Sequence, residues 1–306
     1  MLTRRHVLLI AVLAGTLIVS PAMAQDKNSA RTPIKVVATT SILGDLVKNV
    51  GGDRADVSTL VGPNSDAHVY SPSPLDARKL HEAQVVIVNG LGLEGWMTRL
   101  VQASGTKAAT VIATKGITPR KMEDEHQAGR LITDPHAWQS IANAKVYVAN
   151  IRDGLIKADP AGKTAYEANA KAYTAKLDDL EKEVKAAIAT IPPNHRRIIT
   201  THDAFGYFGD AYGMEFIAPE GVSTETEPSA KDVAKIITQI RKQKIPAVFL
   251  ENISDPRLME QIAKESGAKI GGALFSDALS DANGPASTYV DMMRNNIRQF
   301  TAALVS

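Results

Sequence analysis

The sequence of 306 residues contains no cysteine. This excludes disulfide bonds, and it also excludes thiolates as nucleophiles or as metal ligands. It further excludes a cysteine that could carry a lipid anchor. Any metal site in this chain must therefore do without thiolate ligands.

An excess of charge of either sign is also missing, because 35 Lys and Arg residues face 33 Asp and Glu residues. A surface for nucleic acid needs a strongly basic face. The composition therefore predicts no nucleic-acid partner.

Long apolar runs are absent except at the beginning of the chain. Arg4 and Arg5 precede the apolar run from Val7 to Val19, which is short for a membrane span, and Ala22-Met23-Ala24 follows. This pattern predicts a secretory signal over residues 1–24 that is cleaved after Ala24, with Sec and twin-arginine export both open. Cleavage would remove Arg4 and Arg5. We therefore expect a soluble protein of the periplasm with 33 basic and 33 acidic residues.

Apolar runs rich in β-branched residues alternate with helical patterns in the first half. They predict strands at residues 34–40, 57–61, 84–89 and 108–114, with helices at 41–51 and 73–83. Ser41 is the expected N-cap of the first of these helices, and Gly51 its expected end. Strands that alternate with helices predict a parallel sheet.

The second half repeats the pattern. One strand is expected to begin at residue 196, and three more are expected over 214–221, 246–252 and 268–275. A helix is expected over 229–245, with Ser229 as its N-cap. Between the halves, residues 159–191 predict one helix with Asp159 as N-cap and Pro160 as its first residue. At 1.5 Å per residue this helix would be about 45 Å long.

The fold class predicted is α/β, with two lobes that each contain a small, mostly parallel sheet flanked by helices, joined by one long rigid helix. The expected boundaries are 25–158 for the N-terminal metal-binding lobe, 159–191 for the linking helix and 192–306 for the C-terminal metal-binding lobe.

Gly90-x-Gly92-x-x-Gly95 has the spacing of a dinucleotide-binding turn. Such a turn belongs to the first βαβ unit and is followed about twenty residues later by an acidic residue for the ribose. Here it follows the third predicted strand, and no acidic residue comes after Gly95 until Glu123. We therefore expect a tight turn at a strand end and no nucleotide cofactor.

Four side chains share one kind of position, after a strand or just before a helix: His68, His136, His202 and Asp277. This edge of an α/β sheet is where ligands bind, and each half of the chain supplies two of the four. Three neutral imidazoles and a carboxylate form a shell suited to a divalent transition metal. No short motif such as H-E-x-x-H marks the site, so spacing alone leaves open that these are structural histidines.

The second nitrogen of each imidazole needs an acceptor. Asp66, Asp134, Asp203 and Glu251 are candidates by position. The remaining histidines are expected outside the site, and His126 falls in a short polar loop over residues 120–133.

At these residues the sequence resembles the metal-binding receptors of ABC transporters for zinc and manganese, called cluster A-I or family 9 solute-binding proteins. The resemblance covers the mature chain, in order, through the segments "ATTSILGDLVKNVGGD", "DAHVYSPSP", "NGLGLEGW", "DPHAW", "THDAFGYF", "GVSTETEPSAKDV" and "LFSDALS". It implies two four-stranded α/β lobes, a rigid linking helix, and a metal held in the cleft by His68, His136, His202 and Asp277.

Two departures bear on the metal. Zinc-selective relatives often carry a long histidine-rich loop, whereas here the segment holds only His126. Manganese-selective relatives commonly have glutamate at the third ligand position, where this chain has His202. Imidazole suits Zn²⁺ better than Mn²⁺, so zinc is the expected cargo, with manganese or iron as alternatives.

The expected function is that of a monomeric carrier that delivers Zn²⁺ to an ABC permease in the inner membrane, with a metallochaperone as a further partner. Two other functions compete with it. A zinc hydrolase would need an open metal position and a general base, but Asp277 would close the shell. A cell-surface adhesin would need an anchor, and the chain has no lipid-anchor cysteine. We therefore expect no enzyme, and we expect affinity to fall below about pH 6 as the imidazoles protonate.

Overall fold

A computed structural model describes residues 32–124 and 127–305 of the chain. These described residues belong to one compact unit. The predicted signal over residues 1–24 and His126 lie outside the described residues. Within the described part of the chain, none of the helices is long and apolar enough to cross a membrane.

The first lobe is built on a sheet of four parallel strands in the order β2-β1-β3-β4. Its central strand β3 is the run VVIV, which is buried on both faces, as expected for a parallel sheet covered by helices. The strands span Ile34–Ala38 (β1), Ala55–Thr59 (β2), Val85–Val88 (β3) and Ala109–Ile112 (β4).

The second lobe repeats this design with four parallel strands in the order β10-β9-β7-β8. These strands span Arg197–Ile199 (β7), Glu215–Ile217 (β8), Ala247–Glu251 (β9) and Lys269–Leu274 (β10). The two-lobe α/β fold is therefore confirmed, and both main sheets are wholly parallel. The exact lobe boundaries stay a prediction.

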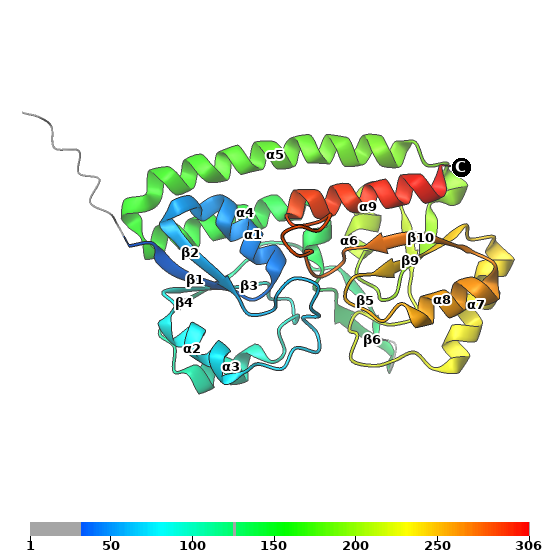
Figure 1. Ribbon diagram of the computed structural model, residues 1–306, viewed down its shortest axis with the longest axis horizontal. Coiled ribbons are helices and arrows are strands. Elements are labelled where there is room, and N and C mark those ends of the chain that lie inside the picture. The colour runs from blue at the N-terminus through cyan, green and yellow to red at the C-terminus, as the bar shows by residue number, and fades with distance from the viewer. Residues whose placement is uncertain (1–31, 125–126, 306) are drawn as a thin grey trace, which may run out of the picture. The chain divides into compact units, whose positions relative to one another are not determined.

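Nine α-helices are present in the described residues (Figure 1). They span Ser41–Gly51 (α1), Pro74–Glu82 (α2), Met97–Ser104 (α3), Ile141–Ala158 (α4), Lys163–Ala189 (α5), Gly206–Tyr212 (α6), Ala230–Gln243 (α7), Arg257–Ser266 (α8) and Tyr289–Leu304 (α9).

Helix caps agree with the sequence at one predicted position and differ at another. Ser229 caps α7 by accepting a hydrogen bond from the Asp232 amide, as predicted. The cap of α1 is Thr40 instead of Ser41, because the Thr40 hydroxyl accepts from the Leu43 amide. The Ser41 hydroxyl is thereby available to the Leu279 amide, 3.0 Å away in the second lobe.

The linking helix begins later than predicted. Residues Pro160–Gly162 form a 3₁₀ turn, and α5 starts at Lys163. Asp159 makes no capping hydrogen bond; its carboxylate accepts from Arg54 at 2.6 Å and from the Tyr166 hydroxyl at 3.0 Å. An ion pair to a distant residue therefore takes the place of the local cap.

One face of α5 is buried along its whole length, which holds the helix against both lobes. It packs on α1 and α4 in the first lobe and on α6 and α9 in the second, and Figure 1 shows it running beside α9. The buried side chains recur every three or four residues: Tyr166, Ala170, Tyr173, Leu177, Leu180, Val184 and Ile188. A single hydrophobic cluster thus continues from the first sheet through α5 to Phe249 and Phe300 in the second lobe. Such continuous packing opposes a wide hinge motion.

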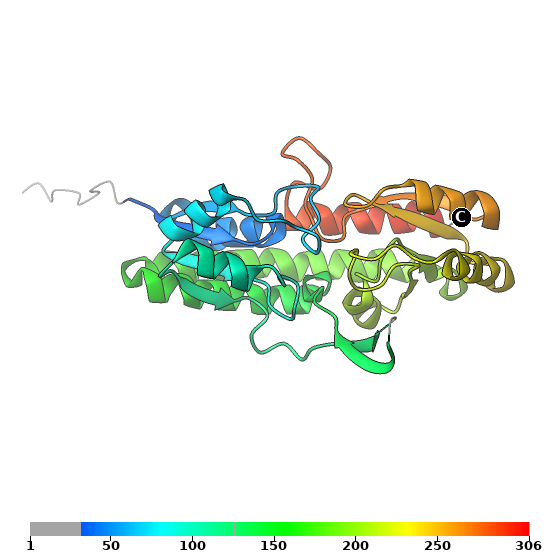
Figure 2. The ribbon, with the colours of Figure 1, turned by 90° about the horizontal axis from the view of Figure 1, so that it is seen from below.

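The segment predicted as a polar loop over residues 120–133 is instead an antiparallel hairpin. Strands Lys121–Asp124 (β5) and Gln127–Thr133 (β6) pair, and Figure 2 shows this hairpin standing out from the body of the lobes. The prediction of a loop was wrong because the segment is too polar to show the alternation typical of a strand. The last residues of the hairpin lead directly to His136.

Candidate metal site

The four predicted ligands come from four separate loops that meet between the lobes. His68 lies in the loop after β2, and His136 follows the hairpin strand β6. His202 and Asp277 lie three residues beyond the ends of β7 and β10. The carboxyl ends of parallel strands lie at one edge of a sheet, so each lobe presents its ligands to the other.

The structure brings all four side chains together, with one donor atom of each within 4.8 Å of the others. Asp277 Oδ2 lies 3.0 Å from His68 Nε2, 3.5 Å from His136 Nε2 and 3.3 Å from His202 Nε2. His68 Nε2 and His136 Nε2 are 3.2 Å apart. Ligands at about 2.0–2.1 Å from a tetrahedral zinc are about 3.3 Å from one another, so this spacing fits such a metal.

Several donor atoms at this centre are buried without a hydrogen-bond partner. They are both carboxylate oxygens of Asp277 and Nε2 of His202. A buried polar atom without a partner is costly, and a carboxylate more so. A divalent cation among these atoms would satisfy all of them at once.

His136 is held by Asp134, one of the predicted acceptors. Asp134 Oδ1 lies 2.8 Å from Nδ1 of the ring and also accepts from the His136 backbone amide at 2.9 Å. Both side chains are fully buried. Because Nδ1 is paired with a carboxylate, Nε2 is the nitrogen that faces the centre.

His202 has an equivalent partner in Glu251, at the end of β9. Nδ1 of His202 lies 2.6 Å from Glu251 Oε2, an ion-pair contact without the alignment of a linear hydrogen bond. The other oxygen, Oε1, accepts from the amides of Thr201 and His202 at 2.8 and 3.1 Å. Glu251 therefore fixes both the ring and the backbone that carries it.

His68 is held differently. Its predicted acceptor, Asp66, contacts the His68 backbone amide at 2.8 Å and not the ring. The second oxygen of Asp66 accepts from the Thr224 hydroxyl at 2.5 Å, which ties this loop to the opposite lobe. Asp203, the remaining candidate, donates its amide to Gly221 O but has no ring contact among those described.

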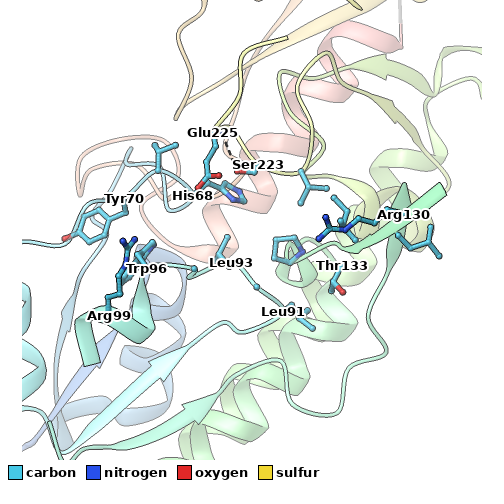
Figure 3. Close-up of a pocket in the computed structure, with 17 residues that line it drawn as sticks. His68, Tyr70, Leu91, Leu93, Trp96, Arg99, Arg130, Thr133, Ser223 and Glu225 are labelled. Carbon is cyan, nitrogen blue, oxygen red and sulfur yellow. Dashed lines mark hydrogen bonds between the residues drawn. The ribbon is translucent and has the colours of Figure 1, made fainter. Parts of the chain in front are cut away.

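His68 is also the predicted ligand closest to solvent. Its side chain is 5% exposed, whereas the other three are fully buried. It borders a cavity of about 1030 Å³, and Figure 3 shows it beside Ser223 and Glu225, with Trp96 and Arg130 farther along the wall.

The charges at the centre shift the affinity of its groups for protons. Burial alone would lower the pKa of His136, but Asp277 and Asp134 beside the ring raise that pKa to about 9. The pKa of His202 is raised in the same way, against its burial, by Glu251 and Asp277. Burial would raise the pKa of Asp277, but His136 and His202 hold it well below its usual range. In the absence of metal the buried rings therefore hold protons at neutral pH, and a cation must displace them.

Two functional contacts were not anticipated from the sequence. The indole nitrogen of Trp138 and the amide of Gln139 both donate to Ser276 O, at 2.9 and 2.8 Å. They tie the segment of His136 to the residue before Asp277. The only signal for them in the sequence is their place two and three residues after His136.

The glycine-rich turn is closed by a side chain of its own, Glu94. Gly90 and Gly92 have positive φ angles of 83° and 91°, as a sharp turn after β3 requires. The carboxylate of Glu94 accepts from the amides of Asn89 and Gly90, at 2.6 and 3.0 Å. These amides, which a nucleotide phosphate would need, are therefore already used within the turn.

Comparison with known proteins agrees with this architecture. A family model described as "Zinc-uptake complex component A periplasmic" (ZnuA) matches residues 36–303. The chain belongs to this family. Its members are substrate-binding receptors for transport and not enzymes, so the hydrolase alternative is excluded.

Relatives within the family are named for different metals. The chain is 33% identical over 296 residues to the manganese-binding lipoprotein MntA of Halalkalibacterium halodurans, with 96% of each chain covered. It is 32% identical over 295 residues to the iron-binding protein YfeA of Yersinia pestis, covering 96% of this chain and 94% of that protein. The periplasmic zinc-binding protein TroA of Treponema pallidum superposes with a TM-score of 0.84 at 31% identity, covering 90% of this chain and all of TroA. The chain is thus a metal-binding receptor of an ABC transporter that acts outside the cytoplasm.

Proposed function

We propose that this protein captures Zn²⁺ in the periplasm and delivers it to a permease in the inner membrane. The observation that carries the proposal is the convergence of three imidazole Nε2 atoms on Asp277 Oδ2, with buried donors that lack any other partner. His68, His136, His202 and Asp277 would be the four ligands. Because all four come from one chain, the receptor would work as a monomer.

The choice of zinc rests on the ligand types. Three imidazoles and one carboxylate suit Zn²⁺, which stands above Mn²⁺ and Fe²⁺ in the Irving–Williams order. The short distances among the donors suit a compact tetrahedral shell.

A manganese or iron receptor is the second candidate, because two specific observations favour it. MntA is named for manganese and YfeA for iron. In addition, both oxygens of Asp277 lack hydrogen-bond partners, so this carboxylate can bind a metal through two oxygens and raise the coordination number above four. Mn²⁺ favours such oxygen-rich, higher coordination.

Competitive titration of the metal-stripped protein decides between these candidates. Zn²⁺ and Mn²⁺ would be titrated separately and then against each other, with His202→Ala as the ligand variant. The proposal predicts one Zn²⁺ per chain, displacement of Mn²⁺ by Zn²⁺, and loss of tight binding in the variant. Displacement of Zn²⁺ by Mn²⁺ would reassign the cargo, and failure to bind any divalent metal would refute the carrier function.

Release is expected to involve small movements around His68. The continuous hydrophobic cluster along α5 opposes a wide opening of the lobes, whereas the loop of His68 borders a cavity and is tied across the cleft by the Asp66–Thr224 hydrogen bond. Export through a signal cleaved after Ala24, and a metallochaperone that contacts the segment around His126, stay predictions for residues outside the described part of the chain.

A further inference from the structure

Arg120 occupies an unusual place, at the base of the hairpin and between the segments that carry two of the ligands. It directly precedes β5, and its backbone oxygen accepts from the Asp134 amide at 3.0 Å, which closes the hairpin behind Thr133. Residues 120 and 134 thus define the two ends of the hairpin, and His136 follows two residues later.

The guanidinium of Arg120 contacts the carboxylate that holds His136. Its Nη1 lies 3.3 Å from Asp134 Oδ2, while Asp134 Oδ1 is taken by the ring and the amide of His136. The two oxygens of this fully buried carboxylate are therefore divided between Arg120 and His136. A carboxylate held on both sides cannot rotate without breaking one of these contacts.

Two further contacts of Arg120 lead to α6, which follows the His202 loop. The Arg120 amide donates to the Tyr207 hydroxyl at 2.8 Å, and that hydroxyl donates to Asp134 O at 3.2 Å. Arg120 Nε lies 3.3 Å from Asp210 Oδ2, also on α6. Arg120 thus joins the segment of His136 to the element that begins four residues after His202.

The fold leaves space for this guanidinium at Gly206, the first residue of α6. A Cβ atom placed there would lie 2.3 Å from Nη1, 2.4 Å from Cζ and 2.7 Å from Nε of Arg120. A methyl group at position 206 would therefore displace the guanidinium without altering its charge.

We propose that Arg120 is a positioning residue for metal retention, which fixes His136, through Asp134, relative to His202. This inference rests on the proposed function of the site. It also makes the hairpin part of the release mechanism, because any displacement of its base moves Arg120 and Asp134 together. A partner that pulled on the hairpin would loosen His136 and favour release of the metal.

The test measures metal association and dissociation rates in the full-length protein, with excess EDTA as the acceptor of Zn²⁺. Arg120→Met should speed dissociation about tenfold with little change in association, the lower end of what loss of a partner of a metal ligand costs. Arg120→Lys should recover part of the effect, and Gly206→Ala should speed dissociation although the charge is kept. In an Arg120→Ala background, Gly206→Ala should have no further effect.

A matched control and a spectroscopic measurement separate positioning from general stability. Arg294→Met removes an exposed guanidinium on α9 whose hydrogen bonds run to Glu183 on α5 and not to a ligand-bearing segment. It should leave dissociation unchanged. The visible absorption of bound Co²⁺, which reports ligand geometry, should change in Arg120→Met and in Gly206→Ala but not in this control.

Dissociation rates and Co²⁺ spectra like those of the unaltered protein in both Arg120→Met and Gly206→Ala would overturn the inference. That result would leave the proposed function intact if the unaltered protein still binds one Zn²⁺ and His202→Ala does not. If the unaltered protein binds no metal, the proposed function itself fails, so the two failures are distinguishable.

Discussion

The proposed ligands that are buried and the one that borders the cavity are held differently. His136 and His202 are fully buried, and each ring has a carboxylate on its Nδ1 side, Asp134 in one case and Glu251 in the other. His68 borders the cavity, and its neighbouring carboxylate, Asp66, binds the backbone and the opposite lobe instead of the ring. The deep half of the site is therefore rigid, and the outer half depends on one loop. Capture and release should both involve His68 first.

The largest expected effect comes from removing one ligand from each half. His202→Ala should weaken Zn²⁺ binding by well over about 100-fold, more than the loss of an outer partner, because it also leaves Glu251 buried without its ion pair. His68→Ala should weaken binding less, since water can reach the vacated position from the cavity. Calorimetric titration of both variants measures the difference. Equal losses would contradict the distinction between the two halves.

Proton release on binding is the next expected effect. Because the pKa of His136 is raised to about 9 and that of His202 is also raised, at least one proton should leave when Zn²⁺ binds at pH 7. Affinity should then keep rising with pH up to about 9, instead of levelling off above about pH 6.5 as unshifted imidazoles would predict. Titrations in buffers of different ionisation enthalpy count the protons. A heat of binding that is the same in all buffers would show that no proton is released, which contradicts the raised pKa values of His136 and His202.

The same shifts predict how the stability of the metal-free protein depends on pH. A ring whose pKa rises on folding from 6.5 to about 9 stabilises the fold fully below pH 6.5, and this contribution is lost as pH rises through 9. Asp277, whose pKa is lowered from 3.8, contributes above pH 3.8 and loses its contribution as pH falls further. The Tm of the metal-free protein should therefore be lower at pH 9.5 than at pH 6, and bound Zn²⁺ should abolish or reverse the decline.

Replacing the carboxylates beside the buried rings should weaken Zn²⁺ binding less than replacing a ligand does. The loss should still exceed that from breaking the contact of Asp66 with Thr224. Asp134→Asn and Glu251→Gln keep the shape of each side chain and remove its charge. Each should weaken Zn²⁺ binding about 10- to 100-fold, because the ring loses its orientation and part of its electron donation. Metal affinity measured by chelator competition tests this. Affinities within twofold of the unaltered protein would mean that the rings are held by packing alone.

The smallest expected effect on Zn²⁺ dissociation comes from breaking the hydrogen bond between Thr224 and Asp66, which joins the His68 loop to the opposite lobe. Thr224→Val removes the hydroxyl that donates to Asp66 and keeps the volume of the side chain. A hydrogen bond of this kind contributes about 1 kcal/mol, so dissociation of Zn²⁺ should speed up about fivefold. Thr238→Val, on the surface of α7, is a suitable control because its hydroxyl bonds only within its own helix. Unchanged dissociation in Thr224→Val would show that the loop of His68 does not depend on this contact.

Most of the fold could be predicted from the sequence because the strands have clear local patterns. The runs around VVIV and AVFLE are apolar and β-branched, and the predicted strands match all eight strands of the two main sheets to within a few residues. Helix α9 is one of several helices for which the sequence analysis gives no range, although the Thr288 hydroxyl accepts a hydrogen bond from the Asp291 amide, a local cap that the sequence could have revealed.

What the sequence could not predict depends on contacts between distant residues. The local sequence predicts Asp159 as a helix cap, but the fold places Arg54, 105 residues away, beside its carboxylate. Arg120 gains its importance only from Asp134 and from α6, and nothing near it in the chain indicates either partner. The four candidate ligands could be predicted because each follows a predicted strand or precedes a predicted helix, whereas the residues that orient them are defined by the packing of the lobes.

Anomalous diffraction at the zinc absorption edge, from crystals of the zinc-loaded protein, would locate the bound metal. We expect one strong peak per chain, about 2.0–2.1 Å from Nε2 of His68, His136 and His202 and bonded to the Asp277 carboxylate. A peak located elsewhere, or one bound through fewer than three of these four residues, would contradict this expectation.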